Sequence, residues 1–375
     1  MVQGQRVVSI GFLLLSHAYS SFAGTSPDVY SKETTDSVTT KSRSITNIAN
    51  GIYMIRHEDA PDLFPQGNTT VIIGNNEVLV VDACYLPSSA KQDIDQIRKW
   101  TNKPVRWLVN THWHYDHTMG NGTYANEFPG IHIVAHTETR NQIVGYNPGW
   151  FERFPSRGDR FQKMLDDGKD ESGNALTEAD IKELKDAIAG IQPVQNEFKK
   201  IIDAPPNVTF DSEMTIDLGD RIVELKFLGR GNTAGDAVVF LPAEKILIVG
   251  DLLDYPVPYL GGGFPTEEIV TLKKMRDMDA LTFIPGHGIA VHGKEYLSLV
   301  IDLMTAVVEE VSKQVYKLGN DSRKLDVVQE AVMKNINLKF WKEKFGQGNK
   351  ENESFFEGFA LSGLIKAAYA EMWRR

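Results

Sequence analysis

The sequence predicts an α/β fold in which two β-sheets pack face to face with helices on the outside. Two blocks of short runs rich in β-branched and aromatic residues support this prediction, and helix-forming segments accompany each block. The chain has 375 residues, of which 42% are hydrophobic and 24% are charged, which is the composition of a globular protein with a large core. We therefore expect a sandwich of two sheets between helical layers.

The first strand block is expected to begin the ordered part of the chain near Ile48. Strands are predicted at residues 51–55, 69–73 and 77–81. A helix over residues 88–100 has apolar residues at helical spacing and a basic end, and it leads to a buried strand at 105–110. A further strand at 131–135 and a helix at 136–144 follow in the same pattern.

The rest of the chain is expected to contain a helical insertion, a second strand block and a helical end. Strands of the second block are predicted at 214–218, 222–227, 237–240 and 246–249, and helices at 297–316, 324–335 and 355–373. The insertion is charged and contains a capping-box-like pattern that begins at Thr177. We predict one domain over residues 48–296, with its insertion at about 146–204, and a C-terminal helical region over 297–375.

The N-terminus has the features of an export signal over residues 1–23. Arg6 supplies positive charge, an apolar stretch follows, and Ser21, Phe22 and Ala23 resemble a small-x-small cleavage site. Cleavage after Ala23 would leave a flexible leader over residues 24–47, which is rich in Ser, Thr and Asp. The apolar stretch is too short for a stable membrane anchor. We therefore expect a periplasmic or secreted protein.

Charge and cysteine content restrict the partners and the cross-links of the chain. The formal net charge is −10 and the pI is near 5.5, which argues against a nucleic acid as the main partner because phosphate binding needs a basic face. Cys84 is the single cysteine, so no internal disulfide can form, and we expect it to be inert core. No motif in the sequence indicates an oligomeric state.

Four coordinating side chains lie within six residues directly after the predicted strand at 105–110. They are His112, His114, Asp116 and His117, in the spacing H-x-H-x-D-H. Residues i and i+2 of an extended segment point to the same side, so the first two histidines can share one metal ion. The other two residues, in the turn beyond, then face a second ion.

Two further coordinating residues follow later strands. Asp251 comes after an apolar strand and a glycine, and His287 lies in the P-G-H-G turn of residues 285–288. Together with H-x-H-x-D-H, these features resemble the metallo-β-lactamase superfamily over residues 48–294. The resemblance implies a four-layer αββα sandwich with a dinuclear site, usually zinc, although iron or manganese would also be compatible.

The resemblance also implies a role for each matching residue. His112 and His114 would bind the first ion, Asp251 would bridge the two ions, and Asp116, His117 and His287 would bind the second. Asp82, at the end of an early strand, matches an acidic residue that orients the metal-binding loop in the family.

One position departs from the family pattern. Where the family has G-x-x-H-T-x-G-D, residues 229–236 read G-R-G-N-T-A-G-D, so Asn232 replaces the third histidine of the first ion. An amide oxygen is a weak ligand for zinc beside imidazole. Asn232 could ligate through oxygen, water could fill its place, or only the second ion could bind tightly. We expect a partly occupied first site.

The resemblance implies a hydrolase in which a metal-bound hydroxide attacks a small-molecule substrate and Asp116 helps to orient the nucleophile. An ester, thioester, lactone or similar acyl compound is expected, because Asp251 stands where one lactamase subclass has cysteine. A β-lactam hydrolase is an alternative, and so is a metal-binding protein in which Asn232 has weakened or abolished catalysis. Candidate substrate contacts are Trp113, Tyr115, Tyr255 and Tyr259.

Overall fold

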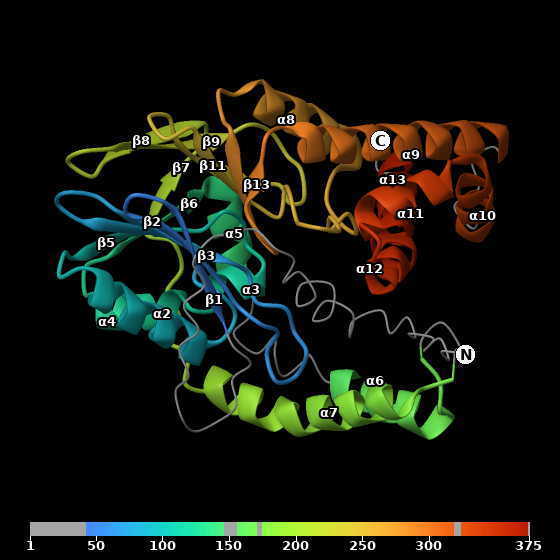
Figure 1. Ribbon diagram of the computed structural model, residues 1–375, viewed down its shortest axis with the longest axis horizontal. Helices are drawn as coiled ribbons and strands as arrows, with labels where there is room; N and C mark the ends of the chain where they lie inside the picture. Colours follow the sequence, from blue (N-terminus) through green and yellow to red (C-terminus); the bar gives the residue numbers. More distant parts are fainter. Residues whose placement is uncertain (1–42, 146–155, 171–174, 319–323, 374–375) are drawn as a thin grey trace.

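The computed structural model describes residues 43–145, 156–170, 175–318 and 324–373. Figure 1 shows two stacked sheets with helices on both outer faces, which confirms the predicted α/β sandwich. The predicted signal peptide, nearly all of the predicted leader and the first residues of the predicted insertion, 146–155, lie outside the described residues. Within the described ranges, no helix is both long enough and apolar enough to cross a membrane.

The first sheet has seven strands that follow one another in sequence order. The first three connections are antiparallel, and the strands from β4 to β7 are parallel to one another. The strands are β1 (Ser44–Ala49), β2 (Ile52–Arg56), β3 (Thr69–Ile73), β4 (Val78–Val81), β5 (Val105–Val109), β6 (His132–His136) and β7 (Val208–Phe210).

The second sheet has six strands in the order β13-β12-β11-β10-β9-β8. Its pairs are antiparallel except that β11 and β12 are parallel. The strands are β8 (Glu213–Asp217), β9 (Ile222–Phe227), β10 (Ala237–Leu241), β11 (Ile246–Gly250), β12 (Thr282–Pro285) and β13 (Val291–His292).

The alternation of apolar side chains along the central strands joins the four layers. In β4, Leu79 and Val81 enter the core between the sheets, whereas Val78 and Val80 face the helices on the outside. In β11, the alternate residues likewise divide between the inner core and the core under the outer helices. Strands that are buried on both faces need a continuous apolar sequence, which is why these runs are conspicuous in the sequence.

Short connections bring helices against the outer face of each sheet. Helices α2 (Pro87–Trp100) and α4 (Asn121–Glu127) cover the first sheet, and α8 (Pro265–Asp277) and α9 (Glu295–Leu318) cover the second. Ile94 and Ile97 provide the buried stripe of α2, as their helical spacing predicts. The short helix α3 (Tyr115–Thr118) follows β5, and α5 (Thr137–Gly145) follows β6.

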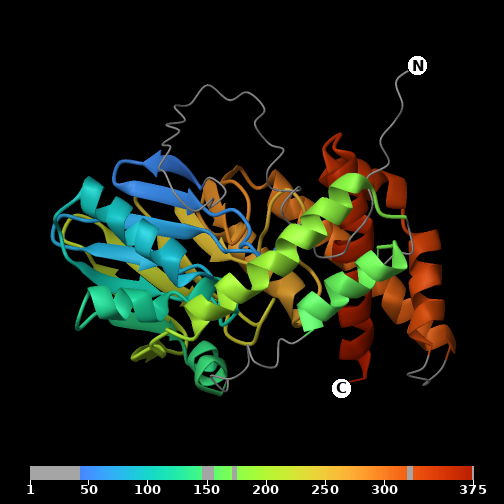
Figure 2. The same cartoon turned by 90° about the horizontal axis from the view of Figure 1, so that it is seen from below.

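The described part of the insertion forms two packed helices, α6 (Ser156–Asp167) and α7 (Glu178–Phe198). Thr177 and Asp180 form a capping box at the start of α7, as the sequence pattern predicts. Gly190 allows α7 to approach the loop before β3, because a Cβ there would lie 2.1 Å from the carbonyl oxygen of Pro61. Figure 2 shows this helical pair crossing the underside of the molecule.

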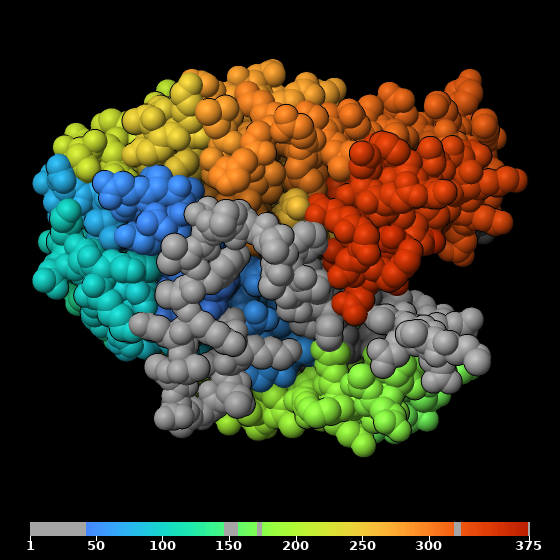
Figure 3. Space-filling model, in the orientation of Figure 1, coloured from blue at the N-terminus to red at the C-terminus, as the bar shows by residue number. Residues whose placement is uncertain are grey.

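The C-terminal helices pack against α8 and α9 and extend the core of the second sheet. They project from one end of the sandwich, and the helices of the insertion reach toward the same end. Figure 3 shows the C-terminal helices and the insertion on either side of this end of the molecule. They are α10 (Leu325–Asn335), α11 (Leu338–Gly346), α12 (Lys350–Phe355), the π-helix η2 (Phe356–Leu361) and α13 (Ser362–Met372).

Several elements differ from the sequence prediction, and three of them have a clear physical reason. The first strand begins at Ser44, inside the predicted leader, because Ile45 and Thr46 pair with β2 at the edge of the sheet. Strand β7 has only three residues, too few for a detectable alternation. Helix α11 was not predicted, because only Ile336 lies between the end of α10 and Asn337, the residue that caps α11.

Candidate metal centre

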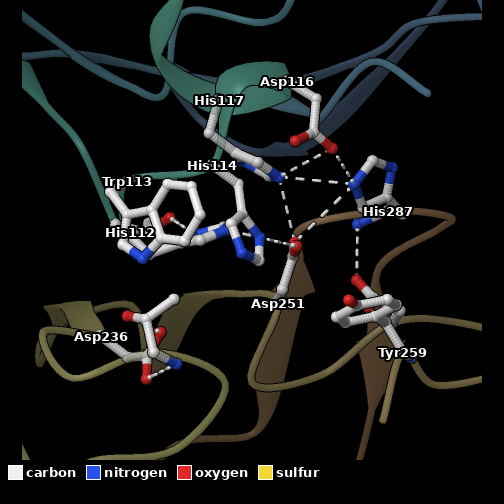
Figure 4. Close-up of polar contacts among 12 residues, drawn as sticks. His112, Trp113, His114, Asp116, His117, Asp236, Asp251, Tyr259 and His287 are labelled. Carbon is white, nitrogen blue, oxygen red and sulfur yellow. Dashed lines mark hydrogen bonds and ion pairs between the residues drawn. The ribbon is translucent and has the colours of Figure 1, made fainter. Parts of the chain in front are cut away.

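The predicted metal-binding residues come together at one edge of the sandwich, beyond the ends of three strands. His112 to His117 follow β5, Asp251 follows β11, and His287 follows β12. Because β4 and β5, and likewise β11 and β12, are parallel pairs, their carboxyl ends lie at the same edge. Figure 4 shows the side chains converging from these loops.

The coordinating side chains form two adjoining groups that share Asp251. The Asp116 group contains Asp116, His117, Asp251 and His287, and the His112 group contains His112, His114 and Asp251. Within each group, one ligand atom from every residue lies within 4.8 Å of the others. This grouping agrees with the division into two ion positions that the motif spacing suggested.

Close contacts define the Asp116 group. Nε2 of His287 lies 3.0 Å from Oδ2 of Asp116, and Nε2 of His117 lies 3.1 Å from Oδ1 of Asp251. The two Nε2 atoms of His117 and His287 are 3.4 Å apart. Imidazole nitrogens that face one another and two carboxylates across such short distances form a suitable donor set for a divalent cation.

The His112 group is more open. Nε2 of His112 lies 3.2 Å from Oδ2 of Asp251, and Nδ1 of His114 lies 3.7 Å from the same oxygen. Among the described residues, Nε2 of His112 and the other oxygen of Asp251, Oδ1, are buried and have no hydrogen-bond partner. Buried polar atoms without a partner call for a ligand, and here they are atoms that metals commonly bind. The residues therefore fit the metal ions that the fold implies.

Asp82 holds both halves of the metal-binding loop, as expected. Its carboxylate accepts hydrogen bonds from the backbone N–H of Thr111 at 2.8 Å, from the Thr111 hydroxyl at 2.8 Å, and from Nδ1 of His117 at 2.9 Å. The Thr111 hydroxyl then accepts from Nδ1 of His112 at 3.0 Å. These bonds favour a proton on Nδ1 of both histidines, which leaves Nε2 facing Asp251 as the atom that would bind a metal ion once any second proton is displaced.

Burial and charge shift the pKa values across the Asp116 group. Burial lowers the pKa of His287, but the Asp251 and Asp116 carboxylates outweigh burial and raise this pKa to about 9. The pKa of His117 is also raised, against burial, by the surrounding carboxylates. Burial raises the pKa of Asp116 and Asp251, yet the facing imidazoles lower both below the usual value. The metal-free centre therefore retains protons that a cation must displace.

Asn232 lies in the turn before β10. Its side chain is buried, and its Nδ2 has no hydrogen-bond partner in the part of the chain that the structure describes. Its turn lies beside the metal-binding loop, because the N–H of Ala237 donates to the carbonyl of Thr111 at 2.8 Å. A role for Asn232 as a metal ligand stays a prediction.

Two positions that support the centre were not identified from the sequence. Asp254 accepts the backbone N–H of His287 at 3.0 Å and that of Tyr259 at 3.3 Å, and burial followed by the Asp251 charge raises its pKa to about 8. Gly67 packs against the ring of His117, where a Cβ would lie 2.4 Å from Cε1. The sequence could have indicated Asp254, because it is an acidic residue three positions after Asp251. A single glycine in a loop, such as Gly67, gives no comparable signal in the sequence.

Two of the four predicted aromatic contacts lie beside His114. The ring of Trp113 is 4.4 Å from that of His114, and the ring of Tyr259 is 6.3 Å from it, both edge-on. Tyr115 packs with the buried cluster under α7. The hydroxyl of Tyr255 donates to Gln347 on the C-terminal side.

A separate buried group, away from this centre, consists of His57, Cys84 and Asp93. Asp93 makes ion pairs with Arg43 at 2.9 Å and with His57 at 3.0 Å. Burial raises the pKa of the Cys84 thiol well above its usual value, which keeps it protonated. These contacts describe a buried ion pair beside an unreactive thiol, in agreement with the prediction that Cys84 is inert core.

The family model of the metallo-β-lactamase superfamily matches residues 63–287 of this chain. A linear primary-alkylsulfatase from a Pseudomonas species is 24% identical over 268 residues, which are 68% of this chain and 48% of the relative. The chain thus spans about half the length of that curated relative.

Solved structures resemble the same part of the molecule. A metallo-β-lactamase from Pontibacter korlensis has a TM-score of 0.50 at 18% identity, covering 70% of this chain and 99% of the other. The DIM-1 metallo-β-lactamase has a TM-score of 0.47 at 19% identity, covering 70% of this chain and 97% of the other. The first of these supports the fold. With the motif residues gathered as described, the family match shows that this chain belongs to the metallo-β-lactamase superfamily and is a hydrolase of that fold.

Proposed function

We propose that this chain is a metal-dependent hydrolase of an ester bond in a small molecule. The observation that carries the proposal is the pair of adjoining, largely buried ligand groups that share Asp251. Two adjoining ligand groups that share a carboxylate would hold two metal ions side by side, which suits a reaction in which one group of the substrate is attacked while another leaves. Zinc is the proposed metal, because histidine and aspartate are common zinc ligands.

The proposed reaction adds water across the ester. When bound, the metal ions supply a Lewis acid and lower the pKa of a water molecule. Asp116 is ionised at neutral pH, since the His117 and His287 imidazoles lower its pKa, and its carboxylate orients the attacking water. The bond between the acid and the alcohol oxygen breaks. The water oxygen joins the acid product, and the released proton goes to the alcohol.

Two kinds of ester are candidates. Carboxylic esters, with thioesters and lactones, follow from the aspartate at position 251. Sulfate esters of alcohols are favoured by one observation, the similarity to a linear primary-alkylsulfatase. Both present an electrophilic centre with an oxygen that gains negative charge, so the same centre suits either. β-Lactam hydrolysis is a less favoured alternative.

A hydrolysis panel on zinc-loaded protein tests this proposal. It should contain a carboxylic ester, a thioester, a lactone, a primary alkyl sulfate and a β-lactam, with Asp251→Ala beside wild type. We expect turnover of at least one ester that falls at least 100-fold in Asp251→Ala. Asp279→Asn is the control, because Asp279 is exposed and pairs only with Lys245 among the described residues.

Two results would contradict the proposal. Metal binding without turnover of any ester would favour a protein with lost catalysis, and turnover that Asp251→Ala leaves intact would place the reaction elsewhere.

We also propose that the chain is exported and cleaved after Ala23. The proposal is supported by the charged, apolar and small-residue pattern of residues 1–23. N-terminal sequencing of the protein recovered from the periplasm of an expression host should begin at Gly24; an intact Met1 in a cytoplasmic fraction would contradict it.

A further inference from the structure

Asn232 occupies a rigid turn between the metal-binding loop and the loop that carries Tyr259. The N–H of Gly231 donates to the carbonyl of Thr233 at 3.0 Å, and the N–H of Phe264 donates to the carbonyl of Gly231 at 2.8 Å. Asp236 accepts the N–H of Thr233 at 2.8 Å. Asn232 is 5% exposed, and its Nδ2 has no hydrogen-bond partner among the described residues. A buried N–H donor without a partner is costly, so an acceptor supplied by a bound molecule would stabilise it.

Tyr259 supplies a second donor close to Asn232. Its ring stands edge-on to His114 at an interplanar angle of 89°, and the described residues give its hydroxyl no hydrogen-bond partner. Burial, with the nearby Asp251 charge, raises its pKa to about 12, so the hydroxyl keeps its proton. The ring also packs against Phe359 of η2, at 5.6 Å between ring centres.

Gly262 lies beside both side chains. A Cβ built on Gly262 would lie 3.7 Å from the Tyr259 hydroxyl and 3.9 Å from Oδ1 of Asn232. The Tyr259 hydroxyl and the amide end of Asn232, whose Nδ2 is bonded to the same carbon as Oδ1, therefore both lie near the position that a side chain at residue 262 would occupy. The neighbouring residue Gly261 packs against α13, where a Cβ on Gly363 would lie 2.7 Å from the Gly261 Cα. The C-terminal helices thus fix the loop that holds Tyr259.

We propose that the Asn232 amide and the Tyr259 hydroxyl together donate hydrogen bonds to the substrate oxygen that gains negative charge during hydrolysis. In a carboxylic ester this is the carbonyl oxygen, and in a sulfate ester it is a non-bridging oxygen. The inference rests on the proposed ester hydrolysis. It gives the replacement of histidine by Asn232 a chemical role, since imidazole bound to a metal could not donate here. Fixed donors of this kind typically contribute factors of about 100 to 1,000 in kcat.

The variant Asn232→Asp separates this role from that of a metal ligand. Aspartate keeps the shape, removes the N–H donor and offers a stronger oxygen ligand. We expect zinc content per chain to be unchanged or higher while kcat falls about 100-fold. If Asn232 is instead a ligand, Asn232→Asp will retain or raise activity, and Asn232→Ala will lose one zinc; either result overturns the proposal.

Tyr259→Phe tests the second donor. It removes only the hydroxyl, so we expect unchanged zinc content and a fall of about tenfold or more in kcat. Activity within twofold of wild type would overturn the role of Tyr259.

Gly262→Ala tests the shared space without touching either donor. The built Cβ makes only ordinary contacts and no left-handed backbone angle is involved, so the variant should fold and bind zinc normally. Its methyl group would occupy the space beside the donors and reduce kcat/KM about tenfold. Gly145→Ala is the matched control, because a Cβ there meets no atom of the described residues within 4 Å. Equal kinetics for the two variants would overturn the proposal.

Anion affinity provides a test of the donor pair that does not depend on catalytic turnover. Sulfate and acetate affinities of the zinc-loaded proteins, measured by calorimetry, should fall at least fivefold in Tyr259→Phe and Gly262→Ala. An inactive wild type would contradict the proposed function, whereas unchanged anion affinity in these variants would contradict the donor pair.

Discussion

The replacement Asp82→Asn is expected to weaken metal binding without removing any metal ligand. Asp82 accepts three hydrogen bonds, two from Thr111 and one from Nδ1 of His117. An asparagine amide has one oxygen and must turn its NH₂ group toward one of these donors. If the NH₂ group faces His117, the proton of that imidazole moves from Nδ1 to Nε2, and Nε2 can no longer coordinate a metal ion. If the NH₂ group faces Thr111, the metal-binding loop loses a hydrogen bond that anchors it.

The magnitude follows from the position of Asp82 behind a ligand. Loss of such a supporting carboxylate typically lowers metal affinity 10- to 100-fold, which corresponds to about 1.4 to 2.7 kcal/mol. Competition with a chromophoric chelator measures the zinc affinity directly. Asp279→Asn is the control, because Asp279 is exposed and, among the described residues, pairs with Lys245 rather than with the metal-binding loop. Equal zinc affinity in Asp82→Asn and wild type would refute the reasoning.

Three further predictions concern the same centre. Gly67→Ala should displace the His117 ring, since its Cβ would lie 2.4 Å from Cε1, and zinc content should fall by at least one ion per chain; full zinc content would contradict this. Zinc affinity should rise about tenfold per pH unit from pH 7 toward the His287 pKa of about 9, because the cation displaces a proton, and calorimetry in buffers of different ionisation enthalpy should detect proton release. The metal-free protein should become less stable over this range. The pKa of His287 is higher in the folded state, so its stabilisation of the fold is complete below about pH 6.5 and is lost as the pH rises through about 9. The pKa of Asp254 is also raised in the folded state, to about 8, so this carboxyl likewise lowers the stability as the pH rises toward 8. Denaturant titrations should show a loss of about 3 kcal/mol from His287 alone, and a metal-free protein that gains stability from pH 6.5 to 9 would contradict the signs.

The metal-binding residues were predictable because their geometry is local or topological. The spacing from His112 to His117 determines which side chains share a side after β5. Asp251 and His287 follow other strands, and the parallel pairing of those strands brings their ends to one edge. Strands buried on both faces, such as β4 and β11, show as unbroken apolar runs for the same reason.

What could not be predicted depends on contacts between segments far apart in the sequence. Gly67 matters only because the loop before β3 packs on His117, and the support of Tyr259 by Phe359 depends on the docking of the C-terminal helices. The edge strand β1 is only partly buried and its sequence resembles a polar leader. Neither apolar periodicity nor motif spacing records such contacts.

The central claim is that two metal ions bind on either side of Asp251. Anomalous diffraction from crystals soaked with zinc tests this most directly. The account predicts two peaks, about 3.5 to 4 Å apart, one among Asp116, His117 and His287 and a weaker one beside His112 and His114. Absence of any peak at Asp251, or a strong peak only at His57, Cys84 and Asp93, would contradict it.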